Sequence, residues 1–185
     1  MLAEKTERKT QPENITDIEL RKPESADGHR VHALIQACPP LDGNSTYCNL
    51  LQCTHFADTC VAATNDDELV GFISAYIPPK QPNVLFVWQV AVSEAARGQG
   101  LAQKMLSSLL EREECDRVQY IETTITPDNS ASWRMFSNFA HSKGWKAEQF
   151  ILFDSRIHFA GEHKDEHLLR IGPFNLEPVA EALGH

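Results

Sequence analysis

The sequence predicts a mixed α/β (α+β) fold, in which a central sheet of about six or seven strands is flanked by helices on both faces. In the first half of the chain two strand-like segments follow each other as a hairpin, and in the second half strands alternate with helices. The chain has 185 residues, of which 42% are hydrophobic, and this is the size of one domain with one core.

Apolar periodicity and turn residues place the elements of the first half. A helix is favoured where a polar N-cap residue precedes an apolar stripe, and a hairpin where turn residues separate two apolar runs. We expect, in order, a strand at 15–21, a helix capped by Ser25 that buries Val31, Leu34 and Ile35 and ends before Pro39, a short helix capped by Ser45, and strands at 59–63 and 69–77 joined at Asn65-Asp66-Asp67.

The second half follows the same logic. A continuous apolar run is typical of a buried strand, and each helix begins at a glycine-rich or asparagine-led turn. We expect a strand at 84–92, a helix that begins near Leu101 and buries Met105, Leu109 and Leu110, a strand at 118–125, a helix that begins near Asn129 and carries Trp133, Phe136 and Phe139, and strands at 149–153 and 167–171.

Composition excludes several function classes. The 17 Lys+Arg against 26 Asp+Glu give a net charge of −9, which argues against a nucleic-acid or anionic-membrane partner and suits a cationic substrate. No apolar run reaches the ~20 residues of a transmembrane helix. Residues 1–14 have no apolar stretch of a secretory signal, so we expect a disordered leader, a single domain at 15–175 and a tail at 176–185. Five cysteines without CxxC spacing indicate free, core-filling thiols in a reducing cytoplasm.

The glycine-rich turn Arg97-Gly98-Gln99-Gly100-Leu101-Ala102 lies between an apolar strand and a helix. Such a turn exposes backbone N–H groups at the positive end of the helix dipole, and this environment suits a phosphate or pyrophosphate. The turn lacks the Lys-Ser/Thr of a nucleotide P-loop, and only Gly98 and Gly100 fit a dinucleotide fingerprint. The alternative is an ordinary tight connection between a strand and a helix.

The Arg-x-x-Gly-x-Ala spacing, together with the order of elements, resembles the GCN5-related N-acetyltransferases. The resemblance implies that acetyl-CoA is the co-substrate and that no metal takes part. It further implies that the strand near Val90 pairs with the pantetheine arm and that the turn amides hold the pyrophosphate. Asn129 caps its helix, contacts the coenzyme, or does both. The implied coenzyme-binding residues are Val90, Ala91, Val92, Arg97, Gly98, Gln99, Gly100, Leu101, Ala102, Asn129 and Ser132.

One position departs from the superfamily pattern. The seventh residue after Asn129 is often a tyrosine that protonates the leaving thiolate, and here it is Phe136. Phenylalanine has no proton to give, so the usual general acid is absent. Tyr47, Tyr120, a thiol and solvent remain as alternatives.

The segment Glu162-His163-Lys164-Asp165-Glu166-His167 contains H-x-x-E-H, the order found in inverted zinc proteases. A zinc site would need a helix here, whereas a strand-like run follows at once. The other two interpretations are a solvated acidic loop and a polar loop over the acceptor site.

Five longer segments carry a more specific pattern: Leu41–Tyr47, Gly71–Pro79, Val84–Val92, Glu122–Pro127 and Arg170–Phe174. They resemble one family within this superfamily, the L-2,4-diaminobutyrate acetyltransferases of ectoine synthesis. The resemblance implies acetyl transfer to the γ-amine of L-2,4-diaminobutyrate, with alternatives in another small amine or a protein lysine as acceptor, or in a non-catalytic acyl-CoA-binding module. By analogy we expect a cytoplasmic homodimer that acts in osmotic stress.

The acceptor chemistry assigns provisional roles. Ammonium groups need carboxylates, and one amine must lose its proton before it attacks the thioester directly. A backbone N–H near Val90 would stabilise the oxyanion. Trp88, two residues from Val90, shares its strand face by alternation and is expected to wall the pocket. The candidate catalytic residues are Glu166, His163, Asp42 and Tyr47, and the candidate acceptor-binding residues are Asp42, Asn44, Tyr47, Trp88, Thr123, Glu162 and Glu166. For the loop residues, solvation and helix capping are the alternatives.

Overall fold

Seven strands join in one mixed sheet within residues 17–175, the part of the chain that the computed structural model describes. The sheet order is β1-β2-β3-β4-β5-β7-β6, and only β4 and β5 pair in parallel. The predicted mixed sheet is therefore confirmed. The strands are β1 (Ile18–Arg21), β2 (Val61–Asn65), β3 (Glu68–Tyr76), β4 (Val84–Val92), β5 (Tyr120–Ile125), β6 (Ala147–Phe153) and β7 (Glu166–Ile171).

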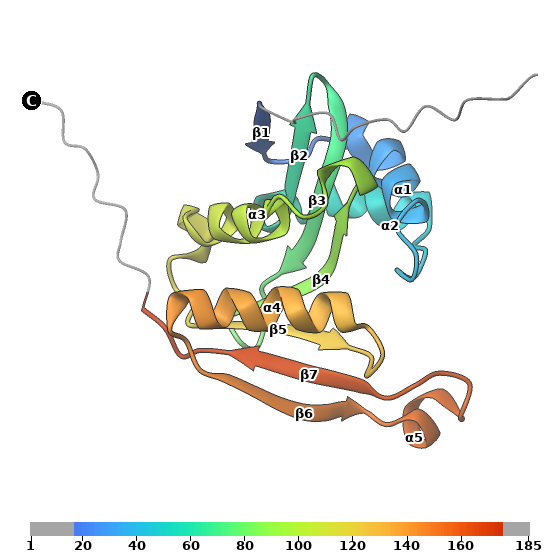
Figure 1. Ribbon diagram of the computed structural model, residues 1–185, viewed down its shortest axis with the longest axis vertical. Coiled ribbons are helices and arrows are strands. Elements are labelled where there is room, and N and C mark those ends of the chain that lie inside the picture. The colour runs from blue at the N-terminus through green and yellow to red at the C-terminus, as the bar shows by residue number, and fades with distance from the viewer. Residues whose placement is uncertain (1–16, 176–185) are drawn as a thin grey trace, which may run out of the picture.

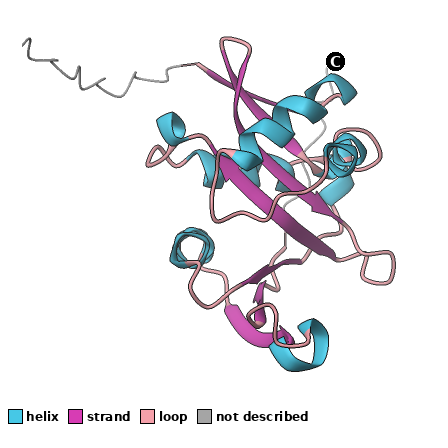
Figure 2. Ribbon diagram, turned by 90° about the vertical axis from the view of Figure 1, so that its right-hand side faces the viewer, coloured by secondary structure: helices cyan, strands magenta, loops and turns pink. Residues whose placement is uncertain are grey.

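Helices cover both faces of the sheet (Figures 1 and 2). On one face, α1 (Gly28–Gln36) packs over β3 and β4, and α2 (Thr46–Gln52) packs against α1. On the other face, α3 (Leu101–Leu110) packs over β2, β3 and β4, and α4 (Ser130–Lys143) lies beside α3 across β5 and β7 (Figure 1). Each face has its own apolar cluster, because successive strand residues point to opposite sides. A short fifth helix, α5 (Ser155–Phe159), follows β6.

The glycine at position 71 allows α3 to approach β3 closely. A Cβ atom there would lie 3.0 Å from the terminal carbon of Met105 and 3.1 Å from a methyl group of Leu101. Both side chains are buried in the core beneath α3. The first turn of α3 is therefore held against the sheet by direct packing, and this fixes the position of the glycine-rich turn that precedes it.

The pairing of β4 with β5 is much shorter than the pairing of β4 with β3. Only Val84, Leu85 and Phe86 pair with β5, whereas β3 pairs with β4 from Phe86 to Val92. The C-terminal parts of β4 and β5 therefore diverge, as Figure 1 shows. One edge of β4 beyond Phe86 keeps unpaired backbone N–H and C=O groups, which an extended ligand can pair with.

A β-bulge in β4 overturns the expectation that Trp88 and Val90 share a face. Ser74 pairs with Gln89 and Ala75 with Val87, so Trp88 is the extra residue. The bulge breaks the alternation of side chains. The ring of Trp88 lies edge-on to that of Tyr76, 6.5 Å away, on the side that carries α1 and α2.

Most predicted elements are present with shifted ends. The strand at 84–92 matches β4 in both bounds, and Ser45 caps α2 by accepting a hydrogen bond from the N–H of Cys48. The expected cap at Ser25 is wrong, because Ser25 lies inside a 3-10 turn. There the buried carboxylate of Asp27 accepts the N–H of Glu24 at 2.8 Å instead. The predicted leader and tail lie outside the described residues.

None of the five cysteines forms a disulfide, and all but Cys48 are buried, as the sequence predicts. Burial raises the pKa of the Cys53 and Cys60 thiols to about 12, which keeps both protonated at neutral pH. In the described part of the chain, no helix has the length and apolar character needed to cross a membrane.

Candidate active site

A cavity of about 570 Å³ opens where β4 and β5 diverge. It lies between the free edge of β4, the glycine-rich turn, the first turns of α3 and α4, and the loop that follows α1. This volume is in the range of small-molecule and cofactor sites. Of the residues predicted to hold coenzyme, Val90, Val92, Arg97, Gly98, Gly100, Leu101, Ala102, Asn129 and Ser132 line it.

The glycine-rich turn presents free backbone donors to this cavity. Gly98 and Gly100 adopt φ angles of 76° and 73°, in the left-handed region that favours glycine. Gly100 is the N-cap residue of α3, and no side chain caps that end. The first N–H groups of α3 therefore stay available for an anion, as the sequence predicts for a pyrophosphate site.

Two side chains from different walls of the cavity donate hydrogen bonds to the carbonyl of Val92. The Nε of Arg97 donates to this oxygen at 3.1 Å, and the thiol of Cys38 donates to it at 3.3 Å. The turn and the loop after α1 are thus both fastened to the end of β4. Two other predicted residues point elsewhere: Gln99 donates to the carbonyl of Ala95, and the side chain of Ala91 is buried in the core beneath α1.

Asn129 has the capping role that its position suggests. Its Oδ1 accepts the N–H of Ser132 at 3.1 Å at the start of α4. Both residues also line the cavity, so capping and coenzyme contact are compatible, and the contact stays a prediction. Phe136, in contrast, is only 2% exposed and packs in the core. The position of the expected tyrosine is therefore occupied by an apolar core residue.

Glu166, which the sequence predicts to bind the acceptor, is the first residue of β7. Its side chain is 16% exposed, and burial raises the pKa of its carboxyl group above the ordinary value. The carboxylate of Asp42 raises this pKa further, whereas the Thr124 hydroxyl and the His163 ring lower it. Asp42 and Glu166 are therefore close enough to interact, although they come from distant parts of the sequence.

His163 is oriented toward Glu166. Its Nδ1 lies 2.8 Å from the carbonyl of Lys164, and because a carbonyl only accepts, Nδ1 carries the proton in that contact. Its Nε2 lies 4.0 Å from the Glu166 carboxylate. The ring also packs on Phe159 of α5, with centroids 4.7 Å apart.

The loop that carries His163 is fixed by α5, a helix that the sequence does not predict. The hydroxyl of Ser155 donates to the carbonyl of His163 at 2.5 Å, and the N–H of Ser155 donates to Asp165 at 2.6 Å. Asp154 caps α5 by accepting two backbone N–H groups. The Asp-Ser pair just before this segment is a capping signal that could have indicated the helix.

The zinc alternative for the H-x-x-E-H segment is wrong. Residues from Glu166 onward form β7 rather than a helix, so neighbouring side chains face opposite sides. His167 packs edge-on against Trp133, 6.3 Å away, on the α4 side. In residues 17–175 no three His, Cys, Asp or Glu side chains converge as a metal site would require. Glu162, the remaining carboxylate predicted for the acceptor, is exposed on the loop.

Asp42 and Asn44, both predicted to bind the acceptor, lie in the loop between α1 and α2, beside β4. Gln89, which the sequence interpretation missed, holds both: its Nε2 donates to the Asp42 carbonyl and its Oε1 accepts from the Asn44 amide, each at 2.7 Å. Tyr47, in the first turn of α2, is 69% exposed. Trp88 is half-exposed and packs against Tyr76, another residue that the sequence interpretation missed.

The register of β5 shows which way two further candidate residues, Thr123 and Tyr120, are placed. Thr123 lies on the same face of β5 as Ile121 and Ile125 and is buried, whereas Thr124 lies on the side of Glu166. Thr123 as an acceptor contact stays a prediction. Tyr120 pairs with Val84 at the closed end of the β4–β5 contact, away from the divergence, so it is poorly placed to act as the general acid.

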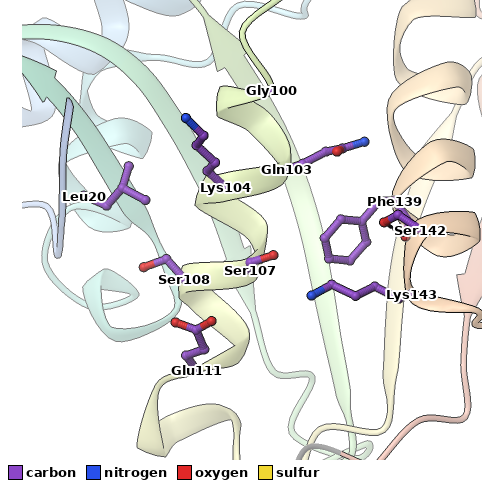
Figure 3. Close-up of a pocket in the computed structure, with 10 residues that line it drawn as sticks. All are labelled: Leu20, Gly100, Gln103, Lys104, Ser107, Ser108, Glu111, Phe139, Ser142 and Lys143. Carbon is purple, nitrogen blue, oxygen red and sulfur yellow. Dashed lines mark hydrogen bonds between the residues drawn. The ribbon is translucent and has the colours of Figure 1, made fainter. Parts of the chain in front are cut away.

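A shallower cavity of about 540 Å³ continues outward between α3 and α4 (Figure 3). Gly100 and Gln103 line both cavities, so the two are contiguous. Lys143 extends from α4 across this groove, and Lys104 and Glu111 line it from α3. Two ammonium groups against one carboxylate give this outer groove a positive charge in a chain that is negative overall.

Comparison with known proteins agrees with this geometry. Residues 28–140 match the acetyltransferase (GNAT) family. An L-2,4-diaminobutyric acid acetyltransferase of Methylotuvimicrobium alcaliphilum is 52% identical over 157 residues, which cover 85% of this chain and 91% of that protein. A protein of the same name from Vibrio cholerae is 49% identical over 152 residues, covering 82% of this chain and 88% of that protein.

A solved structure is similar over almost its full length. The diaminobutyrate acetyltransferase EctA from Paenibacillus lautus, in complex with L-2,4-diaminobutyric acid and coenzyme A, superposes with a TM-score of 0.82 and 42% identity. The match covers 88% of this chain and 98% of that chain. More distant structures, such as the ribosomal-protein-S18-alanine N-acetyltransferase from Escherichia coli at 14% identity and a TM-score of 0.61, share the fold.

Proposed function

The chain belongs to the acetyltransferase (GNAT) family and, within it, to the L-2,4-diaminobutyric acid acetyltransferases, and from this membership we propose how its residues perform the reaction. It transfers the acetyl group of acetyl-CoA to L-2,4-diaminobutyrate in ectoine synthesis. The observation that carries the residue roles is the position of Glu166 and Asp42 on one side of the divergence of β4 and β5, with the glycine-rich turn on the other.

Coenzyme binding falls to the glycine-rich turn and the free edge of β4. The N–H groups at the start of α3 and the guanidinium of Arg97 hold the pyrophosphate, and the pantetheine arm extends along β4 near Val90. The thioester carbonyl would then lie beside β4 backbone donors that have no partner in β5. An N–H group there stabilises the oxyanion that forms during attack.

Acceptor binding falls to the carboxylates. Diaminobutyrate carries two ammonium groups and one carboxylate, so Asp42 and Glu166 stabilise its cationic end. Glu166 is also the general base, because its carboxylate lies on the same side as Asp42 and burial raises its pKa, which makes it a stronger proton acceptor than an exposed glutamate. The neutral amine then attacks the thioester carbonyl carbon directly. As the new C–N bond forms, the C–S bond breaks, and coenzyme A leaves as a thiolate that takes up the proton lost by the attacking nitrogen. His163, with its Nε2 directed at Glu166, stabilises the carboxylate and passes the proton outward.

Regiochemistry and acceptor choice test this function. We expect one product, N-γ-acetyl-diaminobutyrate, identified by NMR after incubation with acetyl-CoA, and release of free thiol at the same rate. Ornithine, lysine, a polyamine and a peptide pool serve as competing acceptors. A higher kcat/KM for any of these, or acetyl-CoA binding without thiol release, would overturn the proposal.

We infer that the chain forms a homodimer through β6. Five apolar side chains on β6 and α5 are exposed: Phe150, Ile151, Leu152, Phe153 and Ile157. This stretch lies at the edge of the sheet, where an unprotected apolar strand favours pairing with another chain. Ile151→Glu is expected to give a monomer in analytical ultracentrifugation, whereas Ala147→Glu, on the same strand, is expected to leave the dimer intact. A monomeric wild-type chain would refute this inference.

We also infer a cytoplasmic enzyme of the osmotic stress response, because acetyl-CoA and reduced thiols are cytoplasmic and because ectoine is a protective solute. Cell fractionation and transcript levels after a salt shift would test this inference. Recovery of the chain in a secreted or membrane fraction would count against it.

A further inference from the structure

The side-chain amide of Gln89 is buried, and both of its ends are hydrogen-bonded to the same loop. Gln89 is only 8% exposed, and it uses both ends of its amide on the loop between α1 and α2: its nitrogen donates to the carbonyl of Asp42, and its oxygen accepts from the Asn44 amide. Both contacts are 2.7 Å long. Ser74, the residue paired with Gln89 across β3 and β4, has a buried hydroxyl without a hydrogen-bond partner in residues 17–175. The Gln89 amide is therefore directed to the loop and not to its neighbour in the sheet.

The bulge at Trp88 explains why this amide can reach the loop. In a regular strand, Trp88 and Gln89 would face opposite sides of the sheet. The extra residue in β4 turns both toward the side that carries α1 and α2. Gln89 thus stands on the strand that the coenzyme arm follows, next to Val90, and its side chain reaches into the acceptor side.

Little else fastens this stretch of the loop to the sheet. Among the described residues, the thiol of Cys38 bonds to Val92 before the stretch, and Ser45 caps α2 after it. Between these two points, Asp42 and Gly43 are exposed, and Leu41 packs at the margin of the core beneath α1. The two bonds to Gln89 are the polar contacts that fix residues 42–44 relative to β4.

We propose that Gln89 is a positioning residue for the acceptor: it fixes the distance between the Asp42 carboxylate and the β4 edge where the thioester lies. This proposal rests on the proposed function. The distance decides how long an acceptor can be when its cationic end contacts Asp42 and its reacting amine meets the acetyl group. We call the two hydrogen bonds from Gln89 to the loop the Gln89 latch. Loss of this latch therefore lowers the kcat/KM for diaminobutyrate and relaxes discrimination against ornithine, which is one methylene longer. Coenzyme binding, which depends on the glycine-rich turn and the backbone edge of β4 rather than on the Gln89 side chain, stays unchanged.

The test compares Gln89→Met with Gln52→Met. Both residues are glutamines that are more than nine-tenths buried and hydrogen-bonded, but the partner of Gln52 is Asn49 in its own helix. For Gln89→Met we expect kcat/KM for diaminobutyrate to fall about ten- to a hundredfold, the range for lost hydrogen bonds and a misplaced reactant. The KM for diaminobutyrate should rise, the KM for acetyl-CoA should not change, and the ratio of diaminobutyrate to ornithine turnover should fall. Gln52→Met should lower thermal stability without these kinetic changes.

Two more variants keep the test decisive if Gln89→Met does not fold. Gln89→Glu keeps the acceptor for Asn44 but loses the donor to the Asp42 carbonyl, so it should show the same split between the two KM values. Asn44→Ala removes one of the two bonds and should give a smaller effect in the same direction. Equal losses in Gln52→Met, or a parallel rise in the KM for acetyl-CoA, would show that Gln89 is merely structural and overturn the proposal.

Backbone dynamics separate failure of the latch from failure of the proposed function. The heteronuclear NOE of residues 42–44, measured by NMR without any acceptor present, should fall in Gln89→Met relative to wild type, because the loop loses both bonds to β4. Unchanged NOE values overturn the latch. A wild-type protein that does not acetylate diaminobutyrate overturns the proposed function instead, and the NOE measurement still decides whether Gln89 holds the loop.

Discussion

Gly100→Ala tests whether the glycine-rich turn binds coenzyme through its backbone. Gly100 adopts a φ angle of 73°, and a Cβ atom there would meet nothing within 4 Å. The substitution therefore adds conformational strain without a steric clash. Gly144, at the C-terminal end of α4, is a matched control, because its φ angle is 67° and its Cβ would also meet nothing within 4 Å.

The two substitutions should differ in their effects: the one in the turn changes coenzyme affinity, and the control changes thermal stability. A left-handed conformation costs a non-glycine residue about 1 kcal/mol. Gly100 itself is exposed, so an alanine there relieves its strain by a local change of φ while the first turn of α3 stays packed on the sheet. Binding must restore the left-handed form, and the Kd for coenzyme A should rise about fivefold. Gly144 bonds to Ala140 and adjoins Trp145, whose ring stacks on Phe174, and this segment cannot relax. Gly144→Ala should therefore lower the Tm by about 2–4 °C and leave the Kd unchanged.

Isothermal titration calorimetry with coenzyme A, and thermal unfolding without it, measure both quantities for each variant. The double variant Gly98→Ala/Gly100→Ala should weaken binding about thirtyfold, because two strained residues cost about 2 kcal/mol. Unchanged coenzyme affinity in the double variant would refute the backbone cradle. An equal loss of affinity in Gly144→Ala would show that the effect is global.

Three further substitutions address the acceptor side and the fold. Glu166→Gln should lower kcat about 10²- to 10⁴-fold and remove the acidic limb of the pH–rate profile, and an unchanged acidic limb would assign the base elsewhere. The same variant should raise the Tm at pH 7, because the raised pKa of Glu166 means that its ionised form destabilises the folded state as pH rises. Asp27→Asn should lower the free energy of unfolding by about 3 kcal/mol at pH 7 in urea, because the Asp27 carboxylate is buried against Arg21. Since Arg21 lowers the pKa of Asp27, this difference should be complete above pH of about 4 and vanish at lower pH, and a pH-independent difference would contradict the assignment. Ser155→Ala should raise the KM for diaminobutyrate but not for acetyl-CoA, since it frees the carbonyl of His163; equal changes in both would contradict a local role for α5.

The sequence predicts the fold and the local geometry of the glycine-rich turn well because their signals are local. The apolar run of β4, the turn around Gly100 and the cap at Asn129 each depend on a few neighbouring residues, and the structure contains all three. The bulge at Trp88 is different. Whether β4 gains an extra residue depends on how it pairs with β3, and simple alternation therefore placed Trp88 on the wrong face.

For the acceptor side, the sequence predicts which residues are candidates but not the contacts that hold them in place. The sequence interpretation names Asp42, His163 and Glu166 as candidates, and the structure brings the loop of Asp42 and the start of β7 together. The sequence interpretation misses Gln89, because its contacts join residues far apart in the chain. It also misses α5, because this helix is little more than one turn long. Buried amides such as that of Gln89 have no periodic signature, so only the fold reveals what they hold.

The short pairing of β4 with β5 means that backbone hydrogen bonds join the two halves of the sheet over three residue pairs only. The apolar cluster beneath α3 and α4 is continuous across this seam, from Ile73 on β3 to Ile171 on β7. Side-chain packing, and not the hydrogen-bond ladder, therefore carries the cohesion between the halves. The sheet can remain open for a ligand without losing its rigidity, and each round of substrate entry and product release leaves the core intact.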